Sequence, residues 1–285
     1  MTEIKTLFDK DCPIGHKNSL TSTDVVLPEG PLLVCKQCGH RVSLCSKERY
    51  DRTMQTFNTA EGTLPDVTSI NRSFTLHSKR LNLIQKTLGL PPESIDILDV
   101  GCSSGAFLES ARKLNFNIKG VEPAPAAAAT ARTNGFEVYE CALDHQDIPR
   151  NYFNVLTLFE VIEHLENPKA FLKQCKDLLK PGGLLVINTG NTDSWTQKVM
   201  GHRWEYYDIE KHGGHISFFN RHSIQLLAED QGFKVVSLKT RCVKFLERNE
   251  TTAIKYKWLK VLTELLNVPA QLCGKGHDML VILQA

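Results

Sequence analysis

The stretch Ile-Asp-Ile-Leu-Asp-Val-Gly-Cys-Ser-Ser-Gly-Ala-Phe-Leu, residues 95–108, decides the fold of this 285-residue chain. Its first six residues are mostly β-branched or apolar and follow Pro91-Pro92, which is typical of a buried strand. A glycine turn, 101–105, comes next, and apolar residues then recur at helical spacing. The order strand, turn, helix predicts the start of a βαβ unit. Glycines let a ligand approach the backbone closely, and the first turn of a helix offers free N–H groups.

A second predicted strand, residues 117–122, ends in the acid Glu122, roughly twenty residues after the glycine turn. In dinucleotide-binding folds, a carboxylate at this place accepts hydrogen bonds from ribose hydroxyls. The glycine spacing is G-x-x-x-G, with Ser103 at the position of the middle glycine in the dinucleotide fingerprint. The sequence therefore favours a nucleoside without a pyrophosphate over NAD.

Four segments in register resemble the motifs of class I S-adenosylmethionine (SAM)-dependent methyltransferases: 99–105, 121–123, 153–165 and 178–187. The resemblance implies an α/β fold with a seven-stranded Rossmann-like sheet whose last strand is antiparallel. It also implies in-line transfer of the SAM methyl group, with Glu122 on the ribose and Asp144 near the adenine, although Asp147 competes for that role. The residues expected to bind SAM are Asp99, Gly101, Ser103, Gly105, Glu122, Pro123, Asp144, Phe159 and Glu160.

A long polar and aromatic connection, residues 189–219, follows the fifth predicted strand. We expect it at the carboxyl end of the strands, where open α/β sheets bind ligands. Its segment His215-Ile-Ser-Phe-Phe resembles the His-x-Ser/Thr-x-Phe segment of bacterial methyltransferases that act on sugars, lipids and small metabolites. His212 and His215 are candidate general bases for a hydroxyl acceptor. The alternative is that such a histidine bonds the loop backbone and only shapes the pocket.

Four of the nine cysteines fall in residues 1–50, which predict a small zinc-ribbon-like lobe. A Cys35-x-x-Cys38-Gly knuckle follows a short apolar stretch, and Cys12-x-x-x-His16 lies upstream. Zinc takes four such ligands in a tetrahedron. The expected ligands are Cys12, His16, Cys35 and Cys38, with His40 or Cys45 as substitutes for His16. A lobe with buried free thiols is the alternative.

The chain is expected to divide into the lobe at 1–50, a polar linker or lid at 51–72, and the methyltransferase domain at 73–285. A helix is expected before the first strand of the domain, and a late hairpin would place the last strand antiparallel beside the sixth. An inserted helix at 249–266 carries an apolar stripe, which core packing or a homodimer contact explains better than a lipid surface.

The overall composition argues against several classes of protein. A formal net charge of +2 disfavours nucleic acid as a partner, and no apolar run reaches the roughly 18 residues of a membrane span. The first ten residues lack the apolar core of a signal peptide, so we expect a cytoplasmic protein with reduced cysteines.

The function expected from these motifs is methyl transfer from SAM to a small-molecule acceptor, first of all a hydroxyl of a sugar or other metabolite in a glycan or natural-product pathway. One alternative is a ribosomal RNA base methyltransferase that uses the zinc module to read RNA. A second alternative, of a different class, is a non-catalytic SAM-fold binding protein.

Overall fold

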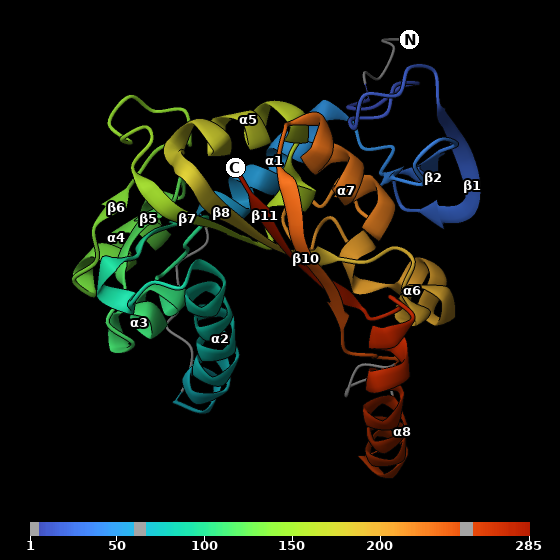
Figure 1. Cartoon of the computed structure of the whole chain (residues 1–285). Coiled ribbons are helices and arrows are strands. Elements are labelled where there is room, and N and C mark those ends of the chain that lie inside the picture. The colour runs from blue at the N-terminus through green and yellow to red at the C-terminus, as the bar shows by residue number, and fades with distance from the viewer. Residues whose placement is uncertain (1–5, 60–66, 246–252) are drawn as a thin grey trace. The chain divides into compact units, whose positions relative to one another are not determined.

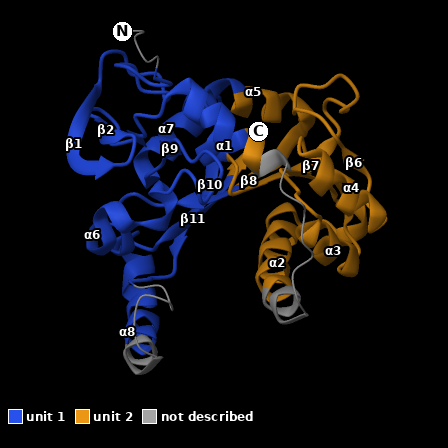
Figure 2. Cartoon of the chain, turned by 180° about the vertical axis from the view of Figure 1, so that it is seen from behind, with its two compact units in different colours: residues 1–54, 162–170, 187–282 blue, residues 55–161, 171–186, 283–285 orange. Residues whose placement is uncertain are grey.

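The computed structural model describes residues 6–59, 67–245 and 253–285, and the chain forms two compact units (Figures 1 and 2). Unit 1 comprises residues 1–54, 162–170 and 187–282. Unit 2 comprises residues 55–161, 171–186 and 283–285. Each unit therefore draws on segments that are far apart in the sequence.

The elements of unit 2 begin with a long helix and continue as alternating strands and helices. They are α2 (Val67–Leu88), β4 (Asp96–Val100), α3 (Ala106–Lys113), β5 (Asn117–Val121), α4 (Pro125–Thr133), β6 (Val138–Tyr139), β7 (Phe153–Phe159), most of α5 (Pro168–Leu178) and the first part of β8 (Leu179–Gly190). Helix α2 packs against α3, and α3 contacts β5. This succession is the predicted series of βα units.

Unit 1 contains the N-terminal strands and most of the C-terminal third of the chain. Its elements are β1 (Leu20–Leu27), β2 (Gly30–Cys35), β3 (Arg41–Val42), most of α1 (Lys47–Thr59), α6 (Trp195–Met200), β9 (Ser217–Phe218), α7 (Arg221–Asp230), β10 (Lys234–Arg241), α8 (Ala253–Leu272) and most of β11 (Asp278–Gln284). Helices α7 and α8 both contact β10.

The large sheet has seven strands in the order β10-β11-β8-β7-β4-β5-β6. Strand β4 pairs in parallel with β5 and with β7, and β5 pairs in parallel with β6. Strand β11 is last in the chain, lies between β10 and β8, and is antiparallel. The predicted fold class is therefore confirmed, including the position and direction of the last strand.

A second sheet has four strands in the order β1-β2-β3-β9. The first three belong to the expected N-terminal lobe, but β9 comes from the connection at 189–219, and Arg41 of β3 pairs with Phe218 of β9. The same connection contributes Trp204 and Tyr207 to a buried cluster with Leu27, Leu32 and Phe218. The sequence indicated a ligand-facing loop here and gave no sign of this pairing.

Residues 51–72, expected as a linker or lid, lie largely in α1 and α2, and residues 60–66 are outside the described part of the chain. Helix α2 begins at Val67, six residues before the expected start of the methyltransferase domain at residue 73. The division at 1–50, 51–72 and 73–285 stays a prediction. Within the described ranges, no helix has both the length and the apolarity needed to cross a membrane.

Candidate functional site

The glycine turn of unit 2 lies where two parallel strands end side by side. Val100 of β4 pairs with Val121 of β5, and the Gly101 N–H donates to the Val121 carbonyl at 2.8 Å. The turn needs left-handed backbone at Gly101, Ser103 and Gly105, with φ of +74°, +49° and +92°. A Cβ on Gly101 would come 2.9 Å from a methyl carbon of Val161. A larger residue would thus be strained at Gly101 and would also crowd the turn.

Glu122 follows β5 directly, and two backbone N–H groups hold its carboxylate. One carboxylate oxygen accepts the Ser103 N–H and the other accepts the Ala124 N–H, each at 2.8 Å. Burial raises the pKa of Glu122, and these two backbone donors oppose that rise. Each oxygen keeps further acceptor capacity. The carboxylate can therefore receive two donors from a ligand such as a vicinal diol.

Asp99 is buried in β4, beside Thr157 of β7. The Thr157 hydroxyl donates to Asp99 Oδ1 at 2.6 Å. Burial raises the pKa of Asp99 to about 7, and the Thr157 bond and the nearby Arg80 charge act in the opposite direction. Asp99 thus links the end of β4, just before the glycine turn, to the neighbouring strand β7. The sequence did not predict its register partner Thr157.

Arg80 of α2 is a second residue that the motifs did not indicate. Its guanidinium carbon lies 4.2 Å from the centre of the Phe159 ring, which also meets Phe107 edge-on at 4.9 Å. Arg80 is buried although it carries a charge. The available signal was its position four residues before Ile84, on the apolar face of the helix. One face of Phe159, a predicted SAM residue, is thereby occupied by a cation.

Five of the predicted cofactor residues in unit 2 are exposed, which leaves them accessible to a ligand. This group comprises Gly101, Ser103, Pro123, Asp144 and Glu160, and Gly105 is buried under the turn. Glu160 has a left-handed backbone, with φ of +58°. Asp147, the competitor of Asp144, is also exposed and lies 3.5 Å from the Nδ1 atom of His145. The placement of Asp144 or Asp147 near the adenine stays a prediction.

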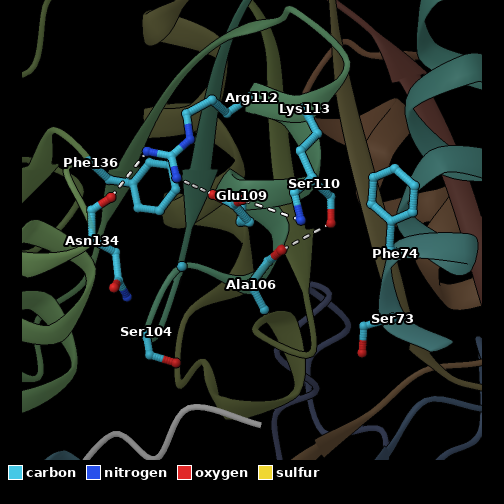
Figure 3. A pocket seen from close by; sticks show the side chains of 11 residues that line it. Ser73, Phe74, Ser104, Ala106, Glu109, Ser110, Arg112, Lys113, Asn134 and Phe136 are labelled. Carbon is cyan, nitrogen blue, oxygen red and sulfur yellow. Dashed lines mark hydrogen bonds and ion pairs between the residues drawn. The ribbon is translucent and has the colours of Figure 1, made fainter. Parts of the chain in front are cut away.

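A pocket of about 250 Å³ lies along α3 (Figure 3). The aromatic rings of Phe74 and Phe136 line it, and Arg112 lies over the Phe136 ring while donating to the Asn134 carbonyl at 3.0 Å. Glu109 pairs with Arg112. This pocket shares Ser104 and Gly105 with the glycine turn, but Asp99, Glu122 and Asp144 are not among its lining residues.

The candidate bases lie in unit 1, in a cluster of stacked rings. His215 stacks with His212 at 4.9 Å and with Tyr206 at 5.4 Å between ring centres, and His164 meets it edge-on at 4.6 Å. The Tyr50 hydroxyl donates to the His164 carbonyl at 2.7 Å. The structure thus brings both predicted histidines together and adds a third histidine and two tyrosines.

The tautomer of His215 follows from its hydrogen bond. Its Nδ1 lies 3.1 Å from the Tyr206 carbonyl, which can only accept, so Nδ1 carries the proton and Nε2 carries the lone pair. Burial, followed by the charges of His164 and His212, lowers the pKa of His215 well below 6.5. The Nε2 atom lies 3.9 Å from the buried carboxylate of Glu163, whose other oxygen accepts from Thr189 at 3.0 Å. His215 is therefore a neutral imidazole at neutral pH.

The four predicted zinc ligands lie together in the N-terminal lobe, with all ligand atoms within 4.8 Å of one another. The Cys12 and Cys38 sulfurs are 3.8 Å apart, and Cys35 Sγ is 3.4 Å from His16 Nδ1. Two sulfurs bound tetrahedrally to one zinc ion at about 2.3 Å would be about 3.8 Å apart. The donor set and its spacing therefore fit zinc.

The surroundings of this cluster also suit thiolate ligands. The His40 backbone N–H donates to Cys38 Sγ, and a donor of this kind stabilises zinc-bound sulfur. The Cys35 thiol lies 3.2 Å from the Ser19 hydroxyl, which itself donates to the His16 carbonyl. The proposed substitutes lie elsewhere: His40 Nε2 is 3.0 Å from Ser217 Oγ, and the Cys45 thiol bonds the Ser46 carbonyl.

Comparison with known proteins finds relatives that are named as methyltransferases. The ubiquinone biosynthesis O-methyltransferase of Shewanella pealeana is 32% identical over 135 residues, covering 44% of this chain and 57% of the relative. The enzyme of the same name from a Bradyrhizobium strain is 31% identical over 137 residues, covering 46% and 51%. The chain thus spans about half the length of the curated relatives it matches.

Solved structures share the fold at low sequence identity. The 1,6-didemethyltoxoflavin-N1-methyltransferase of Burkholderia thailandensis, solved with S-adenosylhomocysteine, has a TM-score of 0.53 at 14% identity, covering 87% of this chain and 96% of that one. A SAM-dependent methyltransferase of Mesorhizobium loti gives 0.53 at 16% identity, covering 73% and 96%. The family model described as "Methyltransferase domain" matches residues 75–238, more than half of the chain. The chain therefore belongs to the methyltransferase domain family.

Proposed function

We propose that this protein is a SAM-dependent methyltransferase that transfers the methyl group to a hydroxyl of a small-molecule acceptor, first of all a sugar or another metabolite. The observation that carries the proposal is the Glu122 carboxylate, held by two backbone N–H groups beside the glycine turn. The names of the curated relatives, which are O-methyltransferases of a small-molecule pathway, support a small acceptor.

The residues of unit 2 suit SAM by the chemistry of each part of that molecule. Glu122 would accept hydrogen bonds from the two ribose hydroxyls, and Asp144 would accept one from the adenine amino group. The backbone of Gly101 and Gly105 would border the ribose and the methionine portion of SAM. SAM supplies an activated methyl group together with its leaving group. The protein's own tasks are then to align the acceptor and to exclude water.

His215, with His212 as the second candidate, is proposed to take the proton from the acceptor hydroxyl. An imidazole can accept a proton only while it is neutral, and the lowered pKa of His215 keeps it neutral at physiological pH. Its Nε2 atom carries the lone pair because Nδ1–H is committed to the Tyr206 carbonyl. The His212 ring, stacked on His215, restricts its rotation.

Zinc is proposed as a structural ion held by Cys12, His16, Cys35 and Cys38. Four protein ligands leave no open position, which is typical of structural rather than catalytic zinc. The ion would tie the turn at Cys12–His16 to the knuckle at Cys35–Cys38. Its proposed role is thus to stabilise the N-terminal sheet.

The competing functions remain distinguishable. Ribosomal RNA as the acceptor is disfavoured by the formal net charge of +2, because RNA binding draws on a basic surface. A non-catalytic binding protein would bind S-adenosylhomocysteine but would not transfer a methyl group to an acceptor. The cytoplasmic location expected from the sequence stays a prediction.

The first experiment offers methyl-labelled SAM to the protein with a small-metabolite and nucleotide-sugar extract and, separately, with undermodified ribosomal RNA. Label is expected in the small-molecule fraction, where mass spectrometry then identifies the product. Label found only in RNA would show that RNA, and not a small molecule, is the acceptor. Binding of S-adenosylhomocysteine with no label in either fraction would favour the non-catalytic alternative.

Glu122→Ala is expected to weaken S-adenosylhomocysteine binding more than tenfold in calorimetry, because it removes the charge-assisted acceptors of the ribose hydroxyls. Glu137→Ala is the matched control, since Glu137 is an exposed glutamate of unit 2 that pairs with Lys119. Circular dichroism checks that both variants fold. Equal affinities for the two variants would remove Glu122 from the site.

With the acceptor identified, kcat is expected to stay level between pH 8 and pH 6.5, because a base whose pKa is depressed remains unprotonated over this range. His215→Asn should lower kcat on the order of a hundredfold with unchanged affinity for S-adenosylhomocysteine. The control His222→Asn changes an exposed histidine of unit 1. A loss of rate centred near pH 6.5, or full activity of His215→Asn, would refute the assignment.

The purified protein is expected to contain one zinc ion per chain by elemental analysis, and chelation should lower its resistance to urea. Cys38→Ser should lose the metal, whereas Cys273→Ser, at an exposed cysteine outside the cluster, should keep it. Stoichiometric zinc in Cys38→Ser, or none in the unmodified protein purified without chelators, would count against the proposed ion.

A further inference from the structure

Between Leu259 and Leu272, helix α8 of unit 1 has one face turned toward the unit and another turned toward solvent. On the inward face Thr263 and Ala270 are buried, and Leu259 and Leu266 are half-buried. Five large aliphatic residues are exposed: Val261 by 48%, Leu262 by 47%, Leu265 by 71%, Val268 by 64% and Leu272 by 82%. A surface helix normally turns its apolar face inward. The described part of α8 therefore has an aliphatic face toward solvent in addition to its inward face.

The exposed residues follow the spacing of a helix-pairing seam. Val261, Leu265, Val268 and Leu272 are separated by four, three and four residues, which is the repeat that keeps apolar side chains on one line of a helix. Leu262 widens the line on one side. On the other side Lys260 and Glu264 form an ion pair within the helix at 3.9 Å. The seam itself carries no charge.

We propose that this seam, defined as Val261, Leu265, Val268 and Leu272, packs against the same seam of a second copy of the chain, with the two helices antiparallel about a two-fold axis. In the register centred between Leu266 and Asn267, Val261 of one copy lies opposite Leu272 of the other, and Leu265 lies opposite Val268. Every layer then combines one valine with one leucine. Layers of equal side-chain volume favour even packing along the whole seam.

The exposed area is sufficient for a modest dimer. From their exposed fractions, the five aliphatic side chains present on the order of 500 Å² per copy, more than the single scattered apolar residues of an ordinary surface. Two copies together approach the roughly 1,000 Å² that a biological interface needs. Since the surface is nearly uncharged, apolar and self-complementary, a second copy satisfies it better than a charged partner.

This inference goes beyond the proposed function and does not depend on it. The residues proposed to bind SAM lie in unit 2, and the seam lies in unit 1. Loss of the dimer and loss of cofactor binding can therefore be measured separately in the same variants.

The test is sedimentation equilibrium of the full chain at about 1–50 µM, combined with calorimetric titration of S-adenosylhomocysteine. The unmodified chain is expected to dimerise. Leu265→Glu places a charge at the centre of the seam and should weaken the dimer at least a hundredfold. The matched control is Val199→Glu, which puts the same charge on another exposed aliphatic position of unit 1. Both variants should keep the cofactor affinity of the unmodified chain.

Three outcomes would overturn the proposal. A monomeric chain at 50 µM would show that the seam does not bind itself, and binding of that monomer to phosphatidylcholine vesicles would assign the seam to lipid. A dimer that resists both Leu265→Glu and Leu272→Glu would place the interface elsewhere. Circular dichroism of each variant ensures that a lost dimer reflects the interface rather than unfolding.

Discussion

The parallel register of β4 and β5 is the constraint on which the candidate cofactor site depends. Because Val100 and Val121 end opposite each other, the next residues, Gly101 and Glu122, emerge at one edge of the sheet. The turn then folds back so that its own N–H at Ser103 holds the Glu122 carboxylate. A shift of one residue in this register would separate the Glu122 carboxylate from the Ser103 N–H that orients it.

In unit 1 the equivalent organising feature is the aromatic connection between β8 and β9. Its rings fill the core beneath the N-terminal sheet, and the Tyr206 carbonyl fixes the His215 tautomer. Trp204 donates from Nε1 to His277, so the largest buried side chain also satisfies its polar atom. Core packing and the orientation of a candidate base thus come from the same few residues.

Local patterns predicted what local sequence controls. The glycine turn, the acid after β5 and the Cys-x-x-Cys knuckle each carry a short signature, and each lies in the local structure that the signature predicted. The antiparallel last strand followed from the family resemblance, and the sheet order confirms it. Arg80 escaped prediction because its partner Phe159 is distant in the chain. The pairing of β9 with β3 escaped it because Ser217-Phe218 is too short to read as a strand. The periodicity of a segment can show that a residue such as Arg80 faces the core, but it does not identify the residue's long-range partner.

The pairing of β3 with β9 also has a consequence for biosynthesis. His40 and Ser217, which bond across this junction, are 177 residues apart. A ribosome delivers the N-terminal strands long before residue 217 emerges, so the edge of β3 stays open during most of translation. If the four ligands near that edge bind zinc early, the ion would keep the nascent β1–β2 hairpin ordered until β9 has been synthesised. The N-terminal sheet is therefore completed only after residue 218 has been made, and the N-terminal segment is not a module that could be transplanted whole.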